Sequence, residues 1–471
     1  MRWAGTLRLY ITLTATLAVC AGSHCLAAED PKADPVPAVG LKLTEVKLPG
    51  AAEAHVAVGG GGRYLVFHFK DLRKLGVFDI KARKMVGLVS AADDQVTYTA
   101  GKQHFVVHLG VAGMISRYRL DTLEREKSVP LAAEVIGLGM GSATNGPLIV
   151  VQKSSYDGRG RLFDLNQLQP IETRIVGRRV SHTKEGAFEI GVIIHVSADG
   201  RFVGGTRTGV SPSGVYLAVI EGNTVEVFYE HNSWGLIRPS PNGNRIYGSN
   251  AVYSARLTPL NQRSGYAIPE LTKDCFELGL QPAARGSAPT VRLHVQGDSR
   301  PLLRFYPEQL AIDEVPPQGV TSGNAAWHQR LFLNTAEKAL VAIPADRQRL
   351  ILADFDALTL LNKSGRDYLF VTSQPSTSVK PGEPWSYKVE TRAKHGPVTM
   401  KLESGPEDMT LDRDGELRWK MPAKLQSETI VVSIKDAKDQ EIFHTFKLSA
   451  NPARSHRSPA DPRESAEASP R

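Results

Sequence analysis

The segment Ser197–Gly205, with the sequence SADGRFVGG, contains the pattern that decides the fold: a small polar turn followed at once by a β-rich run. The pattern recurs as GGGGRYLVF at Gly59–Phe67, TAGKQHFVV at Thr99–Val107, ATNGPLIVV at Ala143–Val151 and SPNGNRIYG at Ser240–Gly248. The copies lie about 40 to 55 residues apart, which is the period of a repeat built from one small unit of strands.

Glycines mark the turns of this repeat, because glycine readily adopts the left-handed backbone that a tight hairpin needs. The turn glycines are Gly62, Gly101, Gly146, Gly200 and Gly243. Two weaker copies are expected around Gly286, in ARGSAPTVRLHV, and around Glu337, in TAEKALVAI. With these two copies the chain contains seven repeats.

A second strand pattern follows each turn and often closes in Asp and an aliphatic residue. Its copies are KLGVFDI at Lys74–Ile80, ISRYRLD at Ile115–Asp121, RLFDL at Arg161–Leu165, TVEVFYE at Thr224–Glu230, LLRFYPE at Leu302–Glu308 and RLILADFD at Arg349–Asp356, with a weaker copy near Ala255–Leu257. The branched and aromatic side chains of these strands are suited to packing sheet against sheet.

One such four-stranded unit cannot bury both of its faces, whereas a ring of them can. We therefore predict an all-β fold in which residues 41–368 form a β-propeller of seven blades, with six to eight possible. The alternative is a series of two-sheet sandwiches. Leu41–Leu48 (LKLTEVKL) alternates well and is predicted to supply the strand that closes the last blade onto the first.

The repeated turns and strands resemble those of WD-repeat and YVTN-type propellers of secreted bacterial proteins, over about two thirds of the chain. The Trp-Asp and Tyr-Val-Thr-Asn strings of those families are absent. The resemblance therefore concerns architecture.

From residue 369 to 450 short alternating strands are separated by Pro/Gly turns, which predicts a small β-sandwich. PGEPWSY at Pro381–Tyr387, SGP at Ser404–Pro406 with Met409, and DGELRW at Asp414–Trp419 resemble the Ig-like, dystroglycan-type cadherin-like domains of bacterial surface and exported proteins. The resemblance implies that Trp419 is a core aromatic residue, that Ser404–Met409 forms a corner, and that the domain serves adhesion or spacing.

The same resemblance implies calcium binding in some members, and the candidate ligands here are Asp408, Asp412 and Asp414. No other cofactor is predicted. Calcium takes six to eight oxygen ligands, and a DxDG string supplies only a few. A hairpin turn with Asp and Gly at its tip is the simpler interpretation.

The two ends of the chain have compositions of their own. Residues 1–28 combine Arg2 and Arg8, the apolar run Leu9–Ala21 and a small-residue stretch, which predicts a cleaved secretory signal peptide. A membrane anchor and a lipoprotein signal at Leu17–Cys20 are the alternatives. Residues 29–40 are predicted to be a flexible linker and residues 451–471 a disordered tail.

Export leaves Cys275 as the single cysteine of the mature chain, so no internal disulfide is expected. The 471 residues carry a formal net charge of +8 without a long basic block, which gives no indication of nucleic-acid binding. No later stretch reaches 18 apolar residues, so we predict no transmembrane segment in the mature chain.

No catalytic, cofactor-binding or metal-binding residue is predicted. His104 and His108 are four apart, but on a strand that places them some 13 Å from each other at about 3.3 Å per residue, too far for one metal ion. The other histidines that we considered are each interpreted as isolated: His55, His68, His195, His294 and His328. Trp234 and Trp327 are candidates for stacking on a ligand, with core packing as the more ordinary role.

These observations predict a non-catalytic exported binding or scaffold protein of the bacterial cell envelope, with an envelope protein or glycan as partner. Its location is periplasmic, cell-surface or extracellular, and its oligomeric state is open. One alternative is a propeller enzyme, a hydrolase, lactonase or lyase acting on carbohydrate, with Asp93, Asp94 and Asp199 as candidate acids. The other is a structural adhesion or surface protein.

Overall fold

The structure is a computed structural model, and it describes residues 36–450 except 38–39, 155–156, 177–185, 208, 250, 263–265, 282–287, 313–328, 374, 376–377, 380–381 and 423–426. The predicted signal peptide, most of the predicted linker and the predicted tail lie outside the described residues. Gly286, Trp327 and His328 lie outside them as well.

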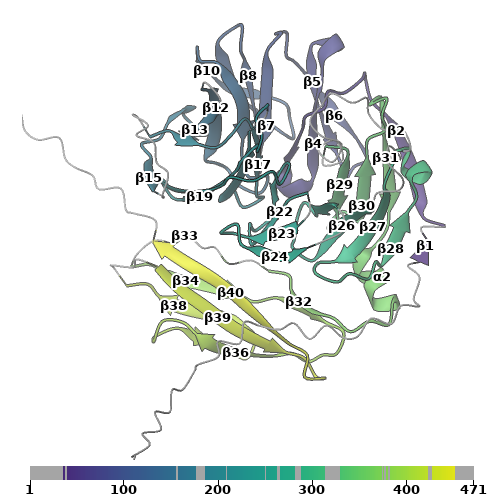
Figure 1. Cartoon of the computed structure of the whole chain (residues 1–471), viewed down its shortest axis with the longest axis vertical. Helices are drawn as coiled ribbons and strands as arrows, with labels where there is room; N and C mark the ends of the chain where they lie inside the picture. Colours follow the sequence, from purple (N-terminus) through teal and green to yellow (C-terminus); the bar gives the residue numbers. More distant parts are fainter. Residues whose placement is uncertain are drawn as a thin grey trace, which may run out of the picture. The chain divides into compact units, whose positions relative to one another are not determined.

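Strands dominate the described residues, and those between 36 and 354 form seven sheets, which we number 1 to 7 in chain order (Figure 1). From inner to outer strand, sheet 1 contains β3 (Val56–Gly59), β4 (Tyr64–Phe69), β5 (Lys74–Asp79) and β6 (Lys84–Ser90). Sheet 2 contains β7 (Val96–Ala100), β8 (His104–Leu109), β9 (Met114–Arg119) and β10 (Arg125–Pro130). Sheet 3 contains β11 (Val135–Gly139), β12 (Leu148–Lys153), β13 (Gly158–Asp164) and β14 (Gln169–Pro170), with β16 (Phe188–Glu189) also paired to β13.

The remaining four sheets follow the same plan. Sheet 4 contains β17 (Ile193–Val196), β18 (Phe202–Thr206), β19 (Val215–Glu221), β20 (Thr224–Glu230) and β15 (Arg174–Val176). Sheet 5 contains β21 (Arg238–Pro239), β22 (Arg245–Tyr247), β23 (Ala251–Ser254) and β24 (Pro259–Gln262). Sheet 6 contains β25 (Tyr266–Pro269), β26 (Phe276–Gln281), β27 (Thr290–Val295), β28 (Leu303–Phe305) and β1 (Val36–Pro37). Sheet 7 contains β29 (Leu331–Asn334), β30 (Ala339–Ala342), β31 (Arg349–Asp354) and β2 (Lys42–Lys47).

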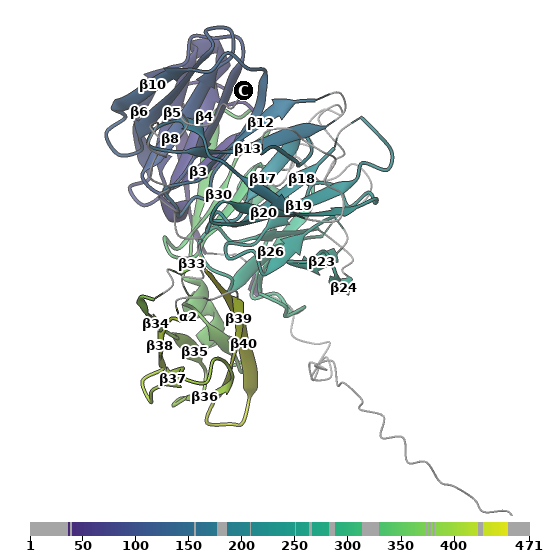
Figure 2. The same ribbon diagram turned by 90° about the vertical axis from the view of Figure 1, so that its left-hand side faces the viewer.

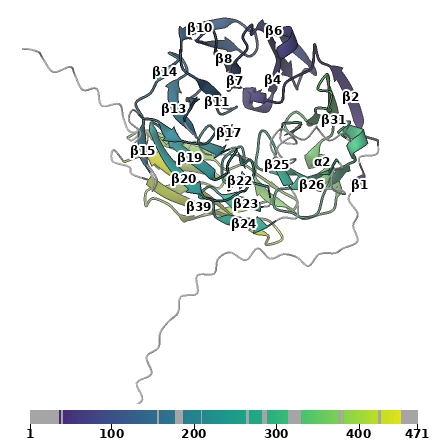
Figure 3. The same cartoon turned by 45° about the horizontal axis from the view of Figure 1, so that its top comes forward.

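Each sheet shares a buried hydrophobic cluster with the next, and sheet 7 shares one with sheet 1. The clusters contain Val66 and Phe105 for sheets 1 and 2, Val106 and Val150 for 2 and 3, Ile149 and Val203 for 3 and 4, Leu217 and Ile246 for 4 and 5, Tyr247 and Ala267 for 5 and 6, Leu278 and Leu333 for 6 and 7, and Phe332 and Phe67 for 7 and 1. Successive residues of a strand point to opposite faces, so both faces of a sheet can be buried. Since the last sheet packs on the first, the sheets form a closed ring, and the fold is a β-propeller (Figure 3).

The ring is closed by a strand from its own N-terminal side, as the alternating segment at residues 41–48 predicts. β2 pairs antiparallel with β31, with Lys42 opposite Asp354 and Lys47 opposite Arg349. Sheet 7 therefore combines an outer strand from the start of the ring with three strands from its end. This prediction is confirmed.

The sequence placed the turn of sheet 6 wrongly. The turn between the two inner strands of that sheet is 270–275 and not the segment around Gly286, which lies between β26 and β27. This turn contains no glycine. It is stabilised instead by the carboxylate of Glu270, which accepts hydrogen bonds from the backbone N–H groups of Cys275 and Phe276. Two strand copies are also shifted: TVEVFYE is β20 and LLRFYPE contains β28, the fourth strand of each sheet rather than the third.

Short helical turns complete this region: η1 (Gly60–Gly62), η2 (Lys70–Leu72), η3 (Pro307–Leu310) and the helix α2 (Ala357–Lys363), whose first turn is capped by Asp356. None of the described helices is both long and apolar enough to cross a membrane.

Beyond α2 the described strands form three further sheets (Figure 2). They are β32 (Leu369–Val371) with β35 (Thr391–Ala393), then β33 (Ser378–Val379), β40 (Glu441–Ala450), β39 (Ser427–Lys435) and β36 (Thr399–Ser404), and then β34 (Pro384–Lys388), β38 (Glu416–Lys420) and β37 (Thr410–Leu411). Side chains from all three sheets share one buried cluster. Trp385 and Trp419 lie opposite each other across β34 and β38 and both belong to this core, as predicted for Trp419.

Replacing Trp419 by Ala is expected to destabilise the C-terminal sheets by about 3–5 kcal/mol, because the deleted ring leaves a cavity in their core. Limited proteolysis followed by mass spectrometry reports the loss as faster cleavage within residues 369–450. The matched control is Phe443→Ala on β40, since that ring is 62% exposed. Equal cleavage rates for the two variants would contradict the assignment of Trp419 to the core.

Two of the candidate calcium ligands, Asp412 and Asp414, lie in the hairpin between β37 and β38, and Asp408 lies in the turn before β37. Asp412 accepts hydrogen bonds from the backbone N–H groups of Asp414 and Glu416, and Gly415 takes a φ of 82° at the tip. Asp412 therefore caps its own turn. Across the described ranges, no group of three or more His, Cys, Asp or Glu side chains is placed to hold a metal ion.

Candidate functional site

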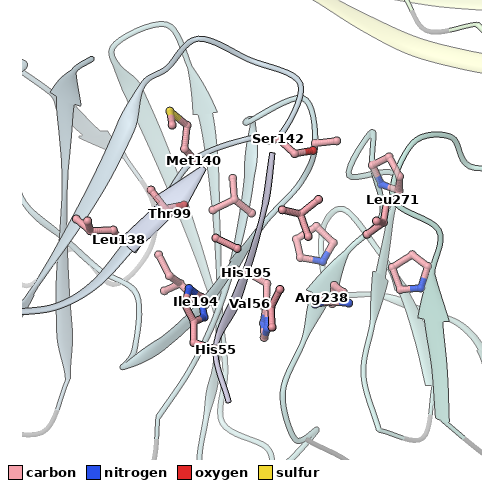
Figure 4. Close-up of a pocket in the computed structure, with 18 of the residues that line it drawn as sticks. His55, Val56, Thr99, Leu138, Met140, Ser142, Ile194, His195, Arg238 and Leu271 are labelled. Atoms are coloured by element: carbon pink, nitrogen blue, oxygen red, sulfur yellow. The ribbon is translucent and has the colours of Figure 1, made fainter. Parts of the chain in front are cut away.

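A cavity of about 120 Å³ lies at the centre of the ring, between the inner strands of sheets 1 to 6 (Figure 4). Its walls are mostly apolar, with residues such as Val56, Leu138 and Ile194. The ionisable residues of the described lining are His55, His195, Arg238 and Glu270. At about 30 Å³ for each water, the cavity holds roughly four water molecules or one compact ion.

At one end of this channel the turns that follow the inner strands are joined by backbone hydrogen bonds. The bonds run from Gly60 N to Gly101 O (2.8 Å), Gly61 N to Ser142 O (2.7 Å), Lys102 N to Thr144 O (2.7 Å), Ala143 N to Ala198 O (2.9 Å) and Asp199 N to Pro241 O (3.1 Å). We call these turns, at 60–63, 101–103, 140–147, 197–201 and 240–244, the turn collar. The side chain of Asn334 joins sheet 7 to it by donating to Gly62 O at 2.8 Å.

Two of the turn glycines that the sequence identified are needed here for a further reason, the close approach of neighbouring turns. A Cβ atom on Gly101 would lie 2.7 Å from the Thr144 carbonyl oxygen, and one on Gly200 would lie 3.1 Å from the Thr144 hydroxyl. A Cβ atom on the neighbouring Gly141 would lie only 2.4 Å from the backbone nitrogen of Gly200. The repeat pattern predicts the hairpins, but it contains no signal for these contacts between turns.

Arg238 lies at the other end of the channel. Every inner strand runs toward its turn, so the first residue of β21, Arg238, and the residue before β3, His55, lie away from the turn collar. No ion pair or hydrogen bond joins the Arg238 guanidinium to the described residues, and its Nη1 atom is inaccessible to solvent without a partner among them. Burial lowers the pKa of Arg238 to about 10, and no acidic neighbour raises it again.

Two imidazoles line the channel near this guanidinium. His55 Nε2 lies 3.1 Å from Tyr98 O, and His195 Nδ1 lies 3.1 Å from Ile237 O, so each ring donates one N–H to a backbone carbonyl. Loss of water, followed by the charge of Arg238, lowers the pKa of His195 to about 3. Loss of water also lowers the pKa of His55. Both rings are therefore neutral at neutral pH.

Glu270 lies at the turn-collar end, after β25. Its carboxylate accepts hydrogen bonds from its own turn and from the hydroxyl of Thr335, and burial raises its pKa to about 7. Arg238 is the first residue of β21, and Glu270 follows β25, the inner strand of the next sheet. Among the described residues the two form no ion pair, and the Glu270 oxygens accept the hydrogen bonds given above.

Asp274, in the same turn, has two buried carboxylate oxygens. Burial and the nearby Glu270 raise its pKa to about 7, and the Ser240 hydroxyl and Asn242 N–H counteract that rise without making hydrogen bonds of good geometry. The folded chain therefore holds a proton that the unfolded chain releases near pH 4.

The free energy of unfolding is expected to fall as pH rises from about 4 to 7, because Asp274 then ionises at a cost in the folded state only. Replacing Asp274 by Asn removes this cost. Between pH 5 and pH 8 the wild type should lose about 3 kcal/mol relative to D274N, at about 1.4 kcal/mol for each pKa unit. Urea unfolding at several pH values measures the difference, with the exposed Asp94→Asn as control. A difference that does not change with pH would contradict the raised pKa.

The acids that the sequence offered for catalysis do not come together. Asp93 accepts hydrogen bonds from the backbone N–H groups of Gln95, Val111 and Ala112, and Asp94 is exposed near Arg73. Asp199 accepts from Ser197, Arg201 and its own turn within the collar. None of the three is among the residues that line the central cavity.

The other residues singled out in the sequence have separate surroundings. His104 lies 3.0 Å from Glu126, and His108 lies 3.1 Å from Leu131 O. Trp234 stacks on Tyr253 with 3.8 Å between ring centroids and packs against the cluster between sheets 4 and 5, which is the core role.

The interpretation of His55 and His195 as isolated is wrong, since both line one cavity together with Arg238. Sequence analysis missed this group because its members come from sheets 1, 4 and 5, far apart in the chain. All three residues lie at the inner strand of their repeat, and this shared position is the only sequence signal that could have identified them. Using that signal requires knowing which strand of each repeat is the inner one.

Comparisons with known proteins add similar folds but no family. No protein-family model matches the chain, and no curated protein matches it. Among solved structures it is similar to the β-propeller domain of Cps50 (Swd1) from Myceliophteria thermophila, at 10% identity and a TM-score of 0.38, with 66% of this chain and 98% of that chain covered. It is also similar to Hsv2 from Kluyvelomyces marxianus, at 8% identity and a TM-score of 0.40, with 63% of this chain and 90% of that chain covered. The Dos1 propeller is similar at 12% identity and a TM-score of 0.40, with 65% of this chain and 81% of that chain covered. The assignment of the fold rests on the sheet topology and not on these similarities.

Proposed function

We propose that this protein is a non-catalytic exported binding protein of the bacterial cell envelope. The propeller face that carries the turn collar binds a protein or glycan, and the C-terminal sheets dock or space the molecule. The observation that carries this proposal is the collar itself, because turns held by hydrogen bonds to one another lose little conformational entropy when a partner binds. Lys102, Asn145 and Lys273 are exposed on or beside these turns and available for contact.

The placement of the acids supports binding over acid–base catalysis. General acid–base work on a glycoside needs two carboxyl groups that face one substrate. Asp199 accepts hydrogen bonds within its own turn, Asp93 accepts from its own turn and from Val111 and Ala112, and Glu270 accepts from its own turn and from Thr335. A carboxylate occupied in this way stabilises a turn and is poorly placed to exchange protons with a substrate.

Affinity capture from the envelope fraction of the source bacterium tests the proposal, with residues 29–471 as bait. We expect K102E/K273E, which reverses two charges on the collar face, to lose the captured partner. The matched control is K70E/K153E, since Lys70, in η2, and Lys153, the last residue of β12, are exposed at the opposite ends of the strands. The proposal fails if no partner exceeds the bead background, or if both double variants capture the same partner equally.

Export is part of the same proposal and has its own test. The tripartite pattern of residues 1–28 supports cleavage before Glu29. Mass spectrometry of the protein recovered from the envelope or the medium should find a chain that begins at Glu29. A full-length chain confined to the cytoplasm would contradict export.

A further inference from the structure

We infer that Arg238 anchors a binding site for a compact oxyanion, a phosphate, a sulfate or the carboxylate of a ligand, at the end of the channel away from the turn collar. The inference rests on the proposed function, since it names the chemistry that one region of a binding protein recognises. It places that chemistry at the channel rather than on the collar.

The first step is the unpaired charge. Arginine side chains that are withdrawn from water usually pair with a carboxylate or another acceptor, because an uncompensated charge there is costly. Arg238 is half-buried and has no such acceptor among the described residues, and its Nη1 atom is closed to solvent. Arg63, Arg83 and Arg207 each form an ion pair with an aspartate. Arg292, Arg304 and Arg347 also each have an inaccessible nitrogen without a partner, but of these arginines only Arg238 belongs to the described lining of the cavity.

The second step is the charge of the surroundings. His55 and His195 face the same cavity as Arg238 and are neutral, while Glu270 lies at the far end with its oxygens occupied. Glu270 is the only acidic residue of the described cavity lining. The end of the channel that contains Arg238 is therefore positive, and apolar walls around a charge strengthen its field.

The third step is size. A cavity of about 120 Å³ is well below the roughly 300–1,000 Å³ of pockets that enclose drug-sized ligands. It accommodates one phosphate, sulfate or carboxylate group, and the planar fork of a guanidinium matches two oxygens of such a group. A larger ligand would place only its anionic group inside. Free ions and the carboxylate of a larger partner share this chemistry.

The test compares anions on residues 29–471. Sodium phosphate, sodium sulfate and sodium acetate are titrated against sodium chloride of the same ionic strength, with melting temperature and calorimetric heat as readouts. We expect a saturable rise of a few degrees with at least one oxyanion, because a ligand that binds only the folded state stabilises it. Phosphate against acetate distinguishes a phosphoryl-type ligand from a carboxylate.

Arg238→Met tests the anchor, since nothing described pairs with the side chain and the variant is expected to fold. It should weaken oxyanion binding by about tenfold or more, the loss expected for a charge-assisted bidentate pair. Arg256→Gln is the matched control: it removes an exposed arginine from the same sheet and should leave binding unchanged. If R238M does not fold, Arg238→Lys keeps the charge without the fork and should show an intermediate loss.

The outcomes separate this inference from the proposed function. If no oxyanion binds but R238M no longer captures the envelope partner, the carboxylate belongs to the partner and the inference stands. If chloride acts as well as every oxyanion and R238M captures the partner normally, the inference is overturned while the proposed function remains. If oxyanions bind through Arg238 and no partner is captured at all, the site stands and the proposed function fails.

Discussion

Removal of residues 41–48 is expected to lower the melting temperature of the propeller by roughly 10–20 °C, since this segment provides the outer strand of sheet 7. Six residues of β2 pair with β31, and Leu48 is buried against the cluster that joins sheets 7 and 1. Lost ladder hydrogen bonds at about 1 kcal/mol each, together with about 2 kcal/mol for Leu48, remove about 5 kcal/mol or more. That loss is comparable to the whole stability of many domains.

The matched comparison is between a chain that begins at residue 40 and one that begins at residue 50, both measured by differential scanning calorimetry against residues 29–471. The first keeps β2 and should melt within a few degrees of the reference. The second leaves β31 as an open edge, which also favours association between molecules. Unchanged melting of the shorter chain would show that the ring does not depend on this strand.

The architecture was predictable because each repeat carries its own local signals. A turn glycine and a β-branched run define a hairpin within nine residues, as Ser197–Gly205 does, and repetition then predicts a ring. The closing strand was predictable for the same reason. Leu41–Leu48 alternates apolar and polar residues, as a strand does, and it lies before the first repeat without a partner strand next to it in the sequence. The turn of sheet 6 was not predictable in this way, because Glu270 stabilises it with a carboxylate where five of the other copies have glycine.

The channel residues were not predictable by the same reasoning. His55, His195 and Arg238 each look ordinary within their own repeat, and only the ring brings them to one cavity. The missing pairing of Arg238 is a property of three-dimensional neighbours and has no counterpart in the local sequence. The contacts between turns of the collar are hidden for the same reason, since they are made by backbone atoms of different repeats.

Replacing Gly243 by Ala is expected to lower the free energy of unfolding by about 2–5 kcal/mol, for two reasons that can be measured separately. The residue has a φ of 71°, which costs an L-residue about 1–2 kcal/mol. Its Cβ would also lie 1.8 Å from Cδ2 of Phe202, a buried ring in the cluster between sheets 4 and 5, and such overpacking costs about 1–3 kcal/mol more.

Gly365 provides the matched control, since it has the same φ of 71° and no atom within 4 Å of its Cβ position. G365A should therefore show the backbone cost alone, and urea unfolding of the two variants isolates the clash. A double-mutant cycle with Phe202→Ala assigns that clash to the ring: in the F202A background the cost of G243A should fall toward that of G365A. If G243A and G365A are equally destabilised, the turn does not press on Phe202. In that case the turn glycine is required at this position only for its backbone conformation.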